Sequence, residues 1–206
     1  MLERGNFQSN KKFLEPFLDE LRKSRVLEIG CGNGSMTGYL KSLGVDIIGI
    51  DMNEEYINNA KKRFGGESFR LMRGEALEFE DNRFDIVLSF DLLEHIPDVI
   101  EHLEEVKRVL REEGKYFLQT PNRYTSIPFS IYKDRSFTKW KEYHLSLQTK
   151  RSLGKKFKKV DFDVEFVKVD IYTEYFRNKL PKILRWIDPQ KLGVVTNLYV
   201  IAEKED

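Results

Sequence analysis

The chain is poor in the residues and runs that mark several large classes of protein. Its 206 residues include one cysteine, which excludes an internal disulfide. No apolar run is long enough to cross a bilayer, and the opening residues MLERGN lack the apolar core of a signal peptide. We therefore expect a cytoplasmic protein without a membrane span.

An excess of charge of one sign is missing as well. The chain has 35 lysines and arginines against 34 aspartates and glutamates, a formal net charge of +1. Proteins that bind nucleic acid usually carry a clear basic excess, so this balance argues against a nucleic-acid partner. The hydrophobic share of 40% and the charged share of 33% are typical of a folded domain rather than a membrane-embedded or disordered chain.

Short apolar runs alternate with amphipathic stretches of helical period. Such alternation predicts an α/β fold with a parallel sheet covered by helices on both faces. Ligands in such sheets bind beyond the carboxyl ends of the strands. We expect strands at residues 25–29, 45–50, 69–72, 84–90, 115–119, 160–170 and 194–202, and helices at residues 9–22, 35–43, 53–64, 97–113 and 148–157.

A glycine-rich turn follows the first expected strand. Residues 26–34 read VLEIGCGNG, and glycines at such a turn let a ligand approach the main chain closely. The spacing is GxGxG, whereas the dehydrogenase fingerprint is GxGxxG, and Ser35 at the place of the third glycine argues against an NAD-linked dehydrogenase. Glu28 places a carboxylate within the apolar run, which suits a ligand with an ammonium group. Asp51 ends the second strand, where a carboxylate can accept hydrogen bonds from both ribose hydroxyls.

Four stretches together resemble the motifs of class I S-adenosylmethionine-dependent methyltransferases, in particular the ubiquinone- and menaquinone-biosynthesis-like branch that acts on small molecules. They are residues 26–34, residues 74–76 (GEA), residues 84–98 (FDIVLSFDLLEHIPD) and residues 109–122 (VLREEGKYFLQTPN). The resemblance implies a Rossmann-like methyltransferase fold, with a mostly parallel seven-stranded sheet and an antiparallel last strand. It also implies S-adenosylmethionine as the cofactor, S-adenosylhomocysteine as the product, and a single methyltransferase domain over residues 1–206.

The same resemblance implies which residues bind the methionine moiety and the ribose. Gly30, Gly32 and the main chain near Cys31 would line the methionine moiety. Glu28 would orient this loop or meet the amino group, directly or through water, and Asp51 would hold the ribose. A nucleophilic role for Cys31 is disfavoured, because no base to activate it is apparent and a small buried residue filling the turn explains it better.

Further positions follow from the later motifs. The resemblance implies that Met52 packs on the adenine and that Glu75 accepts a hydrogen bond from the adenine amino group, with the main chain of Ala76 beside it. Aspartate is the commoner residue at the position of Glu75, so the main-chain contact is the firmer of the two. Phe90 and Asp91 would close over the methionine end of the cofactor.

Two of the three histidines are candidate catalytic bases. A base is needed only if the methyl acceptor carries a proton of high pKa. His95 follows the fourth strand and is either a base or orienting group, or a packed residue at a helix start. His144 resembles a histidine that the family places near the acceptor and is the better candidate. His102 is expected on the exposed side of the long helix. Glu94 and His95 alone make a weak metal pair, so no metal is expected.

Two segments rich in aromatic residues, near 122–147 and 171–192, are either a lid over the site or a second small core. A lid would imply a partly apolar or aromatic acceptor. The basic run within residues 150–159 fits a solvated helix face, with a phosphate- or RNA-binding patch as the alternative.

The function expected from these observations is transfer of a methyl group from S-adenosylmethionine to a small-molecule acceptor by in-line displacement. Methylation of RNA or protein remains an alternative, although residues 89–92 (SFDL) replace the Asn/Asp-Pro-Pro-aromatic motif of enzymes that methylate base amino groups. A non-catalytic adaptor that binds the cofactor is a further alternative. The sequence leaves the acceptor, the atom methylated and the oligomeric state open.

Overall fold

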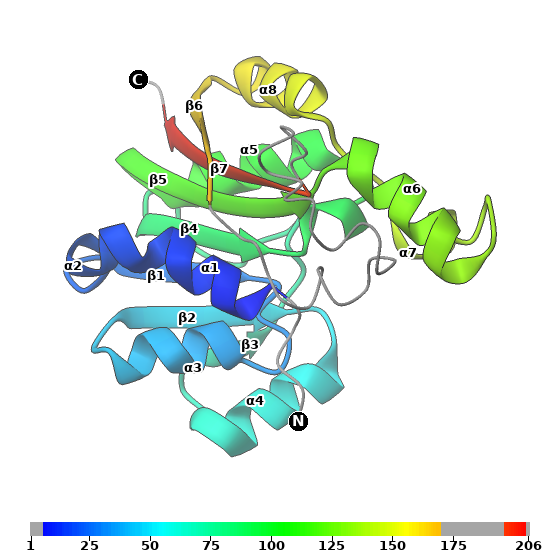
Figure 1. Ribbon diagram of the computed structural model, residues 1–206. Coiled ribbons are helices and arrows are strands. Elements are labelled where there is room, and N and C mark those ends of the chain that lie inside the picture. Colours follow the sequence, from blue (N-terminus) through cyan, green and yellow to red (C-terminus); the bar gives the residue numbers. More distant parts are fainter. Residues whose placement is uncertain (1–5, 170–195, 205–206) are drawn as a thin grey trace.

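A seven-stranded sheet forms the centre of the molecule (Figure 1). The computed structural model describes residues 6–169 and 196–204. The strand order is β3-β2-β1-β4-β5-β7-β6, in which the first five strands are parallel and β7 runs antiparallel to both β5 and β6. The predicted fold class is therefore confirmed. The strands are β1 Arg25–Ile29, β2 Asp46–Asp51, β3 Phe69–Leu71, β4 Phe84–Phe90, β5 Leu110–Pro121, β6 Phe162–Val167 and β7 Asn197–Lys204.

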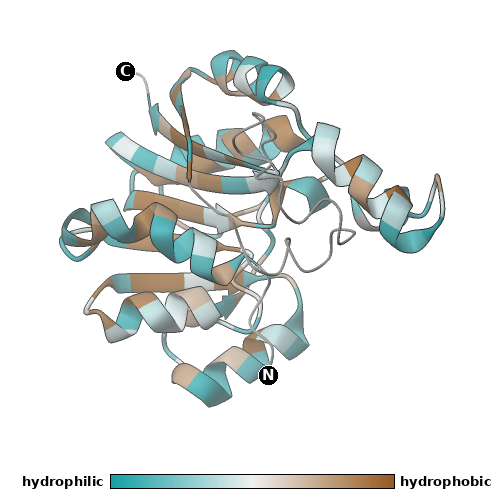
Figure 2. Cartoon of the chain, in the orientation of Figure 1, coloured by the Kyte–Doolittle hydropathy of each residue, from teal (hydrophilic) through white to brown (hydrophobic). Residues whose placement is uncertain are grey.

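Helices cover both faces of this sheet. Side chains alternate along each strand, so Val26 packs with α1, α2 and α3, whereas Leu27 packs with α5 and α8. Figure 2 shows apolar strands between helices whose outer surfaces are polar. The described helices are α1 Phe7–Leu14, η1 Glu15–Phe17, α2 Leu18–Leu21, α3 Ser35–Ser42, α4 Glu54–Phe64, η2 Leu93–His95, α5 Val99–Val109, α6 Arg123–Asp134, α7 Trp140–Tyr143 and α8 Lys150–Lys159.

Among the differences from the sequence prediction, two concern where helices break or end. The expected first helix is broken into three pieces around Pro16, because proline favours the first turn of a new helical segment. The long helix ends at Val109 rather than near Gly114. Leu110 pairs with Phe84 and joins β5, and the pairing register then shifts, so the strand is longer than the apolar run alone indicates.

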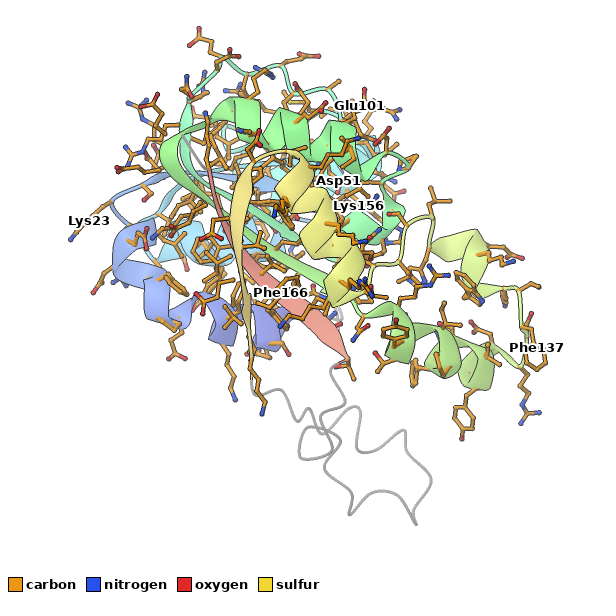
Figure 3. The ribbon with its side chains drawn as sticks, turned by 90° about the horizontal axis from the view of Figure 1, so that it is seen from above. Lys23, Asp51, Glu101, Phe137, Lys156 and Phe166 are labelled. Carbon is orange, nitrogen blue, oxygen red and sulfur yellow. The ribbon has the colours of Figure 1, made fainter. Side chains whose placement is uncertain are left out.

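The segment between β5 and α8 projects from the rest of the fold (Figure 1). Helix α6 has no buried side chain, and Phe137, at the outer tip in Figure 3, is 81% exposed. Tyr124 and Tyr132 are exposed as well, so these aromatic side chains do not form a second core. The second aromatic segment, 171–192, lies outside the described residues. None of the described helices combines the length and apolar character needed to cross a membrane.

Candidate active site at the carboxyl edge of the sheet

The glycine turn is held against the end of the neighbouring strand. The main-chain N–H groups of Gly30 and Cys31 both donate to the carbonyl oxygen of Ile50, at 2.8 and 2.9 Å. Gly30 and Gly32 have φ values of 77° and 53°, which favour glycine. A Cβ at Gly30 would lie 2.9 Å from the side chain of Leu92, so the turn has no room for a larger residue there. The motif thus forms a tight loop at the carboxyl end of β1, held to the end of β2.

Asp51 is fixed at the end of β2 by that same loop. Its Oδ2 accepts from the main-chain N–H of Gly32 at 2.8 Å, and its Oδ1 accepts from the N–H of Asn53 at 2.9 Å. Each carboxylate oxygen can accept more than one hydrogen bond, so both retain capacity for a ligand. The half-buried carboxylate is therefore pre-oriented beside the glycine turn. Asn53 also caps α4, as its sequence position predicts.

Glu28 lies inside the sheet, with 4% of its surface exposed. The hydroxyl of Thr37, on α3, donates a hydrogen bond to its carboxylate. A buried carboxylate requires such partners because its desolvation is costly. Glu28 therefore ties the start of α3 to the strand that carries the glycine turn. Thr37 was not singled out from the sequence, because a threonine within a helix carries no local signal of this contact.

The loop after β3 brings further predicted residues to this edge. The Glu75 side chain is 13% exposed and lies 3.7 Å from the guanidinium of Arg73. Ala76 is exposed and its N–H donates to the carbonyl of Arg73. Met52, directly after Asp51, is 65% exposed, so an apolar side chain is presented to solvent beside the carboxylate.

The end of β4 supplies Phe90 and Asp91. Phe90 is buried in the core, whereas Asp91 has a φ of 51° and is only partly buried. The Asp91 Oδ1 accepts from the side-chain amides of Asn6 at 2.7 Å and Gln119 at 3.1 Å. These contacts join the start of α1 and the end of β5 to β4. The polar Gln119 within an apolar run could have marked its strand end as part of the site, whereas nothing local marked Asn6.

The two candidate bases come together. The rings of His95 and His144 are stacked with centroids 5.7 Å apart and an interplanar angle of 30°. Burial, and next the positive charge that His95 can carry, lower the pKa of His144, whereas Asp91 opposes that shift. His144 Nδ1 is one of the few buried side-chain polar atoms among the described residues without a hydrogen-bond partner. It is therefore mostly neutral at neutral pH and able to accept a proton.

Main-chain hydrogen bonds explain this pairing of histidines from distant parts of the sequence. The N–H groups of Leu145 and Ser146 donate to the carbonyl oxygen of Glu94 at 2.8 and 3.0 Å. The Glu94 side chain is buried, and its Oε2 accepts from Thr120 at 3.0 Å. Glu94 thus joins η2, β5 and the segment that carries His144.

The prediction for His102 is wrong. Instead of lying on the surface, it is fully buried, with Nδ1 2.9 Å from the carbonyl oxygen of Gly74 and Nε2 3.0 Å from the Tyr116 hydroxyl. The stripe that buries Val99 and Val106 also contains position 102, since residues three and four apart share a helix face.

Burial of His102 predicts a loss of stability in mild acid. Burial lowers its pKa below the ordinary value of 6.5, so the folded chain binds fewer protons than the unfolded chain as pH falls through about 6.5. Between about pH 7.5 and 5.5, the free energy of unfolding should decrease toward acid, by up to about 1.4 kcal/mol per pH unit for one such group. Urea titrations of the wild type and of His102→Asn check this. An equally steep decrease in the variant would remove His102 as a cause.

The carboxylates at this edge suit a particular kind of ligand. Glu28 and Asp51 lie on β1 and β2, Asp91 directly follows β4, and Glu75 lies in the loop after β3, so the four come from neighbouring strands. An ammonium group, ribose hydroxyls and an adenine amino group are all hydrogen-bond donors, which match this set of acceptors. The residues therefore fit S-adenosylmethionine better than a ligand with phosphates. Within the described residues, no group of three or more histidine, cysteine, aspartate or glutamate side chains is placed to hold a metal ion.

The chain is similar in sequence to known methyltransferases. Residues 27–118 match the family described as a methyltransferase domain. The ubiquinone biosynthesis O-methyltransferase of Sinorhizobium fredii is 30% identical over 125 residues, 58% of this chain and 50% of that protein. The chain thus spans about half the length of the curated relatives it matches.

Solved structures extend the likeness over nearly the whole fold. A SAM-dependent methyltransferase from Archaeoglobus fulgidus aligns with a TM-score of 0.69 and 21% identity, over 98% of this chain and 96% of that one. An S-adenosylmethionine-dependent methyltransferase from Mesorhizobium loti gives a TM-score of 0.72 and 18% identity, over 95% and 98% of the two chains. At these identities the likeness establishes the fold.

Proposed function

We propose that this chain, which resembles class I S-adenosylmethionine-dependent methyltransferases over residues 27–118 and in its fold, transfers a methyl group from that cofactor to a small-molecule acceptor. The observation that carries the proposal is the Asp51 carboxylate held by the N–H of Gly32 at 2.8 Å. It fixes an acceptor for ribose hydroxyls beside the glycine turn, which would line the methionine end of the cofactor. In this proposal residues 1–206 form one methyltransferase domain. We also propose a cytoplasmic location, because a single cysteine indicates no disulfide framework.

We assign a role in cofactor binding to each residue according to its place at the carboxyl edge of the sheet. Gly30, Cys31 and Gly32 line the methionine moiety, with Glu28 holding their strand to α3. When bound, S-adenosylmethionine supplies a methyl carbon for a nucleophile to attack in line with the carbon–sulfur bond. The positively charged sulfur is the leaving group and keeps the electron pair of the broken bond. The protein's main task is then to hold the acceptor in line with that carbon.

On the adenine side, Asp51 accepts from the ribose and the exposed side chain of Met52 covers the base. Glu75 accepts from the adenine amino group, with the main chain of Ala76 beside it. Phe90 and Asp91 lie at the methionine end, where β4 approaches the two stacked histidines.

His144 is the proposed catalytic base. Its Nδ1 is buried and lacks a hydrogen-bond partner, so it can take the proton that an acceptor hydroxyl loses as its oxygen attacks. His95 stacks on the ring and orients it. The names of the curated relatives support an oxygen acceptor, and the exposed aromatic side chains of α6 support a partly apolar one. In this proposal α6 and α7 form a lid over the acceptor.

A direct assay tests the proposed function. The purified chain is incubated with methyl-labelled S-adenosylmethionine and a panel of catechols, phenols, carboxylic acids, thiols and amines, and transfer is followed as label in the extracted product. Transfer to a phenolic compound is the expected result. Label in added tRNA or in protein, rather than in small molecules, would establish one of the alternative functions, and cofactor binding without transfer to any acceptor would establish the adaptor.

Replacing His144 by alanine should lower kcat/KM for a hydroxyl acceptor by about 100-fold, the usual contribution of a general base. Binding of S-adenosylhomocysteine should change by less than about twofold, because His144 lies on the acceptor side. The wild-type kcat/KM should fall as pH drops below 6.5, through the lowered pKa of His144. Initial rates at several pH values check both points.

Leu145→Ala is the matched control, because Leu145 is the exposed neighbour of the proposed base. Full activity in this control with unchanged activity in His144→Ala would leave only a structural role for the histidine.

A further inference from the structure

One row of side chains on α5 holds the main chain of the loop after β3. The Nδ1 of His102 lies 2.9 Å from the carbonyl oxygen of Gly74. The Oε2 of Glu105 accepts from the N–H of Leu77 at 2.8 Å, and the Nη2 of Arg108 donates to the carbonyl of Leu77 at 2.8 Å. Positions 102, 105 and 108 are three residues apart and so share one side of the helix. The row therefore holds the main chain of the loop that carries Glu75.

The hydrogen bonds of His102 can run in one direction only. A carbonyl oxygen cannot donate, so the proton must sit on Nδ1 and point to Gly74. Burial lowers the pKa of the ring and keeps it neutral, so Nε2 is an acceptor and the Tyr116 hydroxyl donates to it at 3.0 Å. The Tyr116 oxygen then accepts from Ser89, 2.6 Å away. All three side chains are fully buried, so the tautomer and the ring orientation are fixed by the core.

Gly74 is also confined by the end of β1. A Cβ at this position would lie 2.9 Å from Cγ2 of Ile29 and 3.6 Å from Nδ1 of His102. The loop thus lies close to both the end of β1, which carries the glycine turn, and the ring on α5. Glu75 is the next residue, so the direction of its side chain depends on this contact.

We propose that His102 is a positioning residue for base recognition, which sets the Glu75 carboxylate to accept from the amino group of adenine by donating to the carbonyl of Gly74. The inference rests on the proposed function, because it assumes that the loop meets the adenine of the cofactor. Glu105 and Arg108 hold the main chain of the same loop further along, at Leu77. His102 itself touches no ligand in this arrangement.

The test compares two ligands that differ only at the base. S-inosylhomocysteine has a carbonyl oxygen where S-adenosylhomocysteine has the amino group, so a fixed Glu75 carboxylate should disfavour it. Calorimetry on the full chain gives the two dissociation constants and their ratio. We expect the wild type to prefer the adenine ligand by about tenfold or more, the value of one well-placed hydrogen bond to a charged group.

Two amide variants of His102 separate the proposed contact from mere packing. The amide of His102→Asn can occupy the place of Nδ1 and still donate to Gly74, whereas that of His102→Gln reaches toward Tyr116 and leaves the carbonyl without its donor. The asparagine variant should keep the preference within about twofold, and the glutamine variant should reduce it to less than about threefold. Thermal unfolding of each variant is measured alongside. A general loss of stability would weaken the binding of both ligands and leave the ratio of their dissociation constants unchanged.

Each outcome decides the inference. Equal preferences in the two variants, or no preference in the wild type, would overturn the positioning role. Failure of the wild type to bind S-adenosylhomocysteine would instead overturn the proposed function, so the two failures are distinguishable. If the glutamine variant does not fold, Glu105→Ala removes the partly exposed anchor at Leu77, and an undiminished preference in it would equally refute positioning of this loop by α5.

Discussion

Replacing Asp51 by alanine should weaken the binding of S-adenosylhomocysteine by about 100-fold or more. Hydrogen bonds to a charged group contribute about 1.5–3 kcal/mol each, and the ribose offers two hydroxyls. The variant also loses the acceptor that holds the N–H groups of Gly32 and Asn53, so the glycine turn loses part of its support. Calorimetric titration of both proteins at one temperature and salt concentration gives the ratio of dissociation constants.

The same strand supplies a matched control. Asp46 lies at the opposite, amino end of β2 and is exposed, so Asp46→Ala removes an equal charge far from the proposed site. Its affinity should stay within about twofold of the wild type. If both substitutions weakened binding alike, the effect would be one of net charge or folding, and the ribose role of Asp51 would have to be abandoned.

Gly34→Ala should lower the free energy of unfolding by about 2–5 kcal/mol. Gly34 has a φ of +76°, where a residue with a Cβ is strained by about 1–2 kcal/mol. The added Cβ would also lie 2.7 Å from the ring of Phe69 and 2.9 Å from Cβ of Ala60. Overpacking of this kind costs about 1–3 kcal/mol more. Urea unfolding followed by circular dichroism measures the change.

Gly44→Ala is the control that separates the cost of backbone strain from the cost of steric crowding. The φ of Gly44 is +87°, but a Cβ there would meet nothing within 4 Å. Gly44→Ala should therefore cost only the backbone strain, about 1–2 kcal/mol. Equal losses in the two variants would show that the contact of the glycine turn with β3 and α4 contributes little.

The glycine turn and the helix cap beside it could be predicted from the sequence because local patterns encode them. The positive φ values of the glycine turn, the place of Asp51 at a strand end and the cap at Asn53 each follow from residues close together in the chain. The antiparallel last strand came from the resemblance to a family, whereas the strand order was not predicted, since alternating strands and helices leave the order open.

The surroundings of the two candidate bases were less predictable, because contacts between distant residues build them. The stacking of His95 on His144 depends on main-chain bonds from residues 145 and 146 to Glu94, and no local pattern marks those bonds. The bond between Asn6 and Asp91 spans 85 residues. His102 was misplaced because a histidine beside a glutamate on a helix is usually solvated, and here a buried carbonyl and a buried hydroxyl supply the partners that replace water.

The position of β7 between β5 and β6 has a consequence for how the chain folds as it is synthesised. The five parallel strands can associate in the order in which they emerge from the ribosome, but β6 must wait for β7 before it gains a neighbour. Until then, β5 and β6 both present unpaired edges, the kind of surface at which partly folded chains pair with one another. We expect nascent chains that stop after residue 169 to be captured by chaperones, and release to coincide with the appearance of β7.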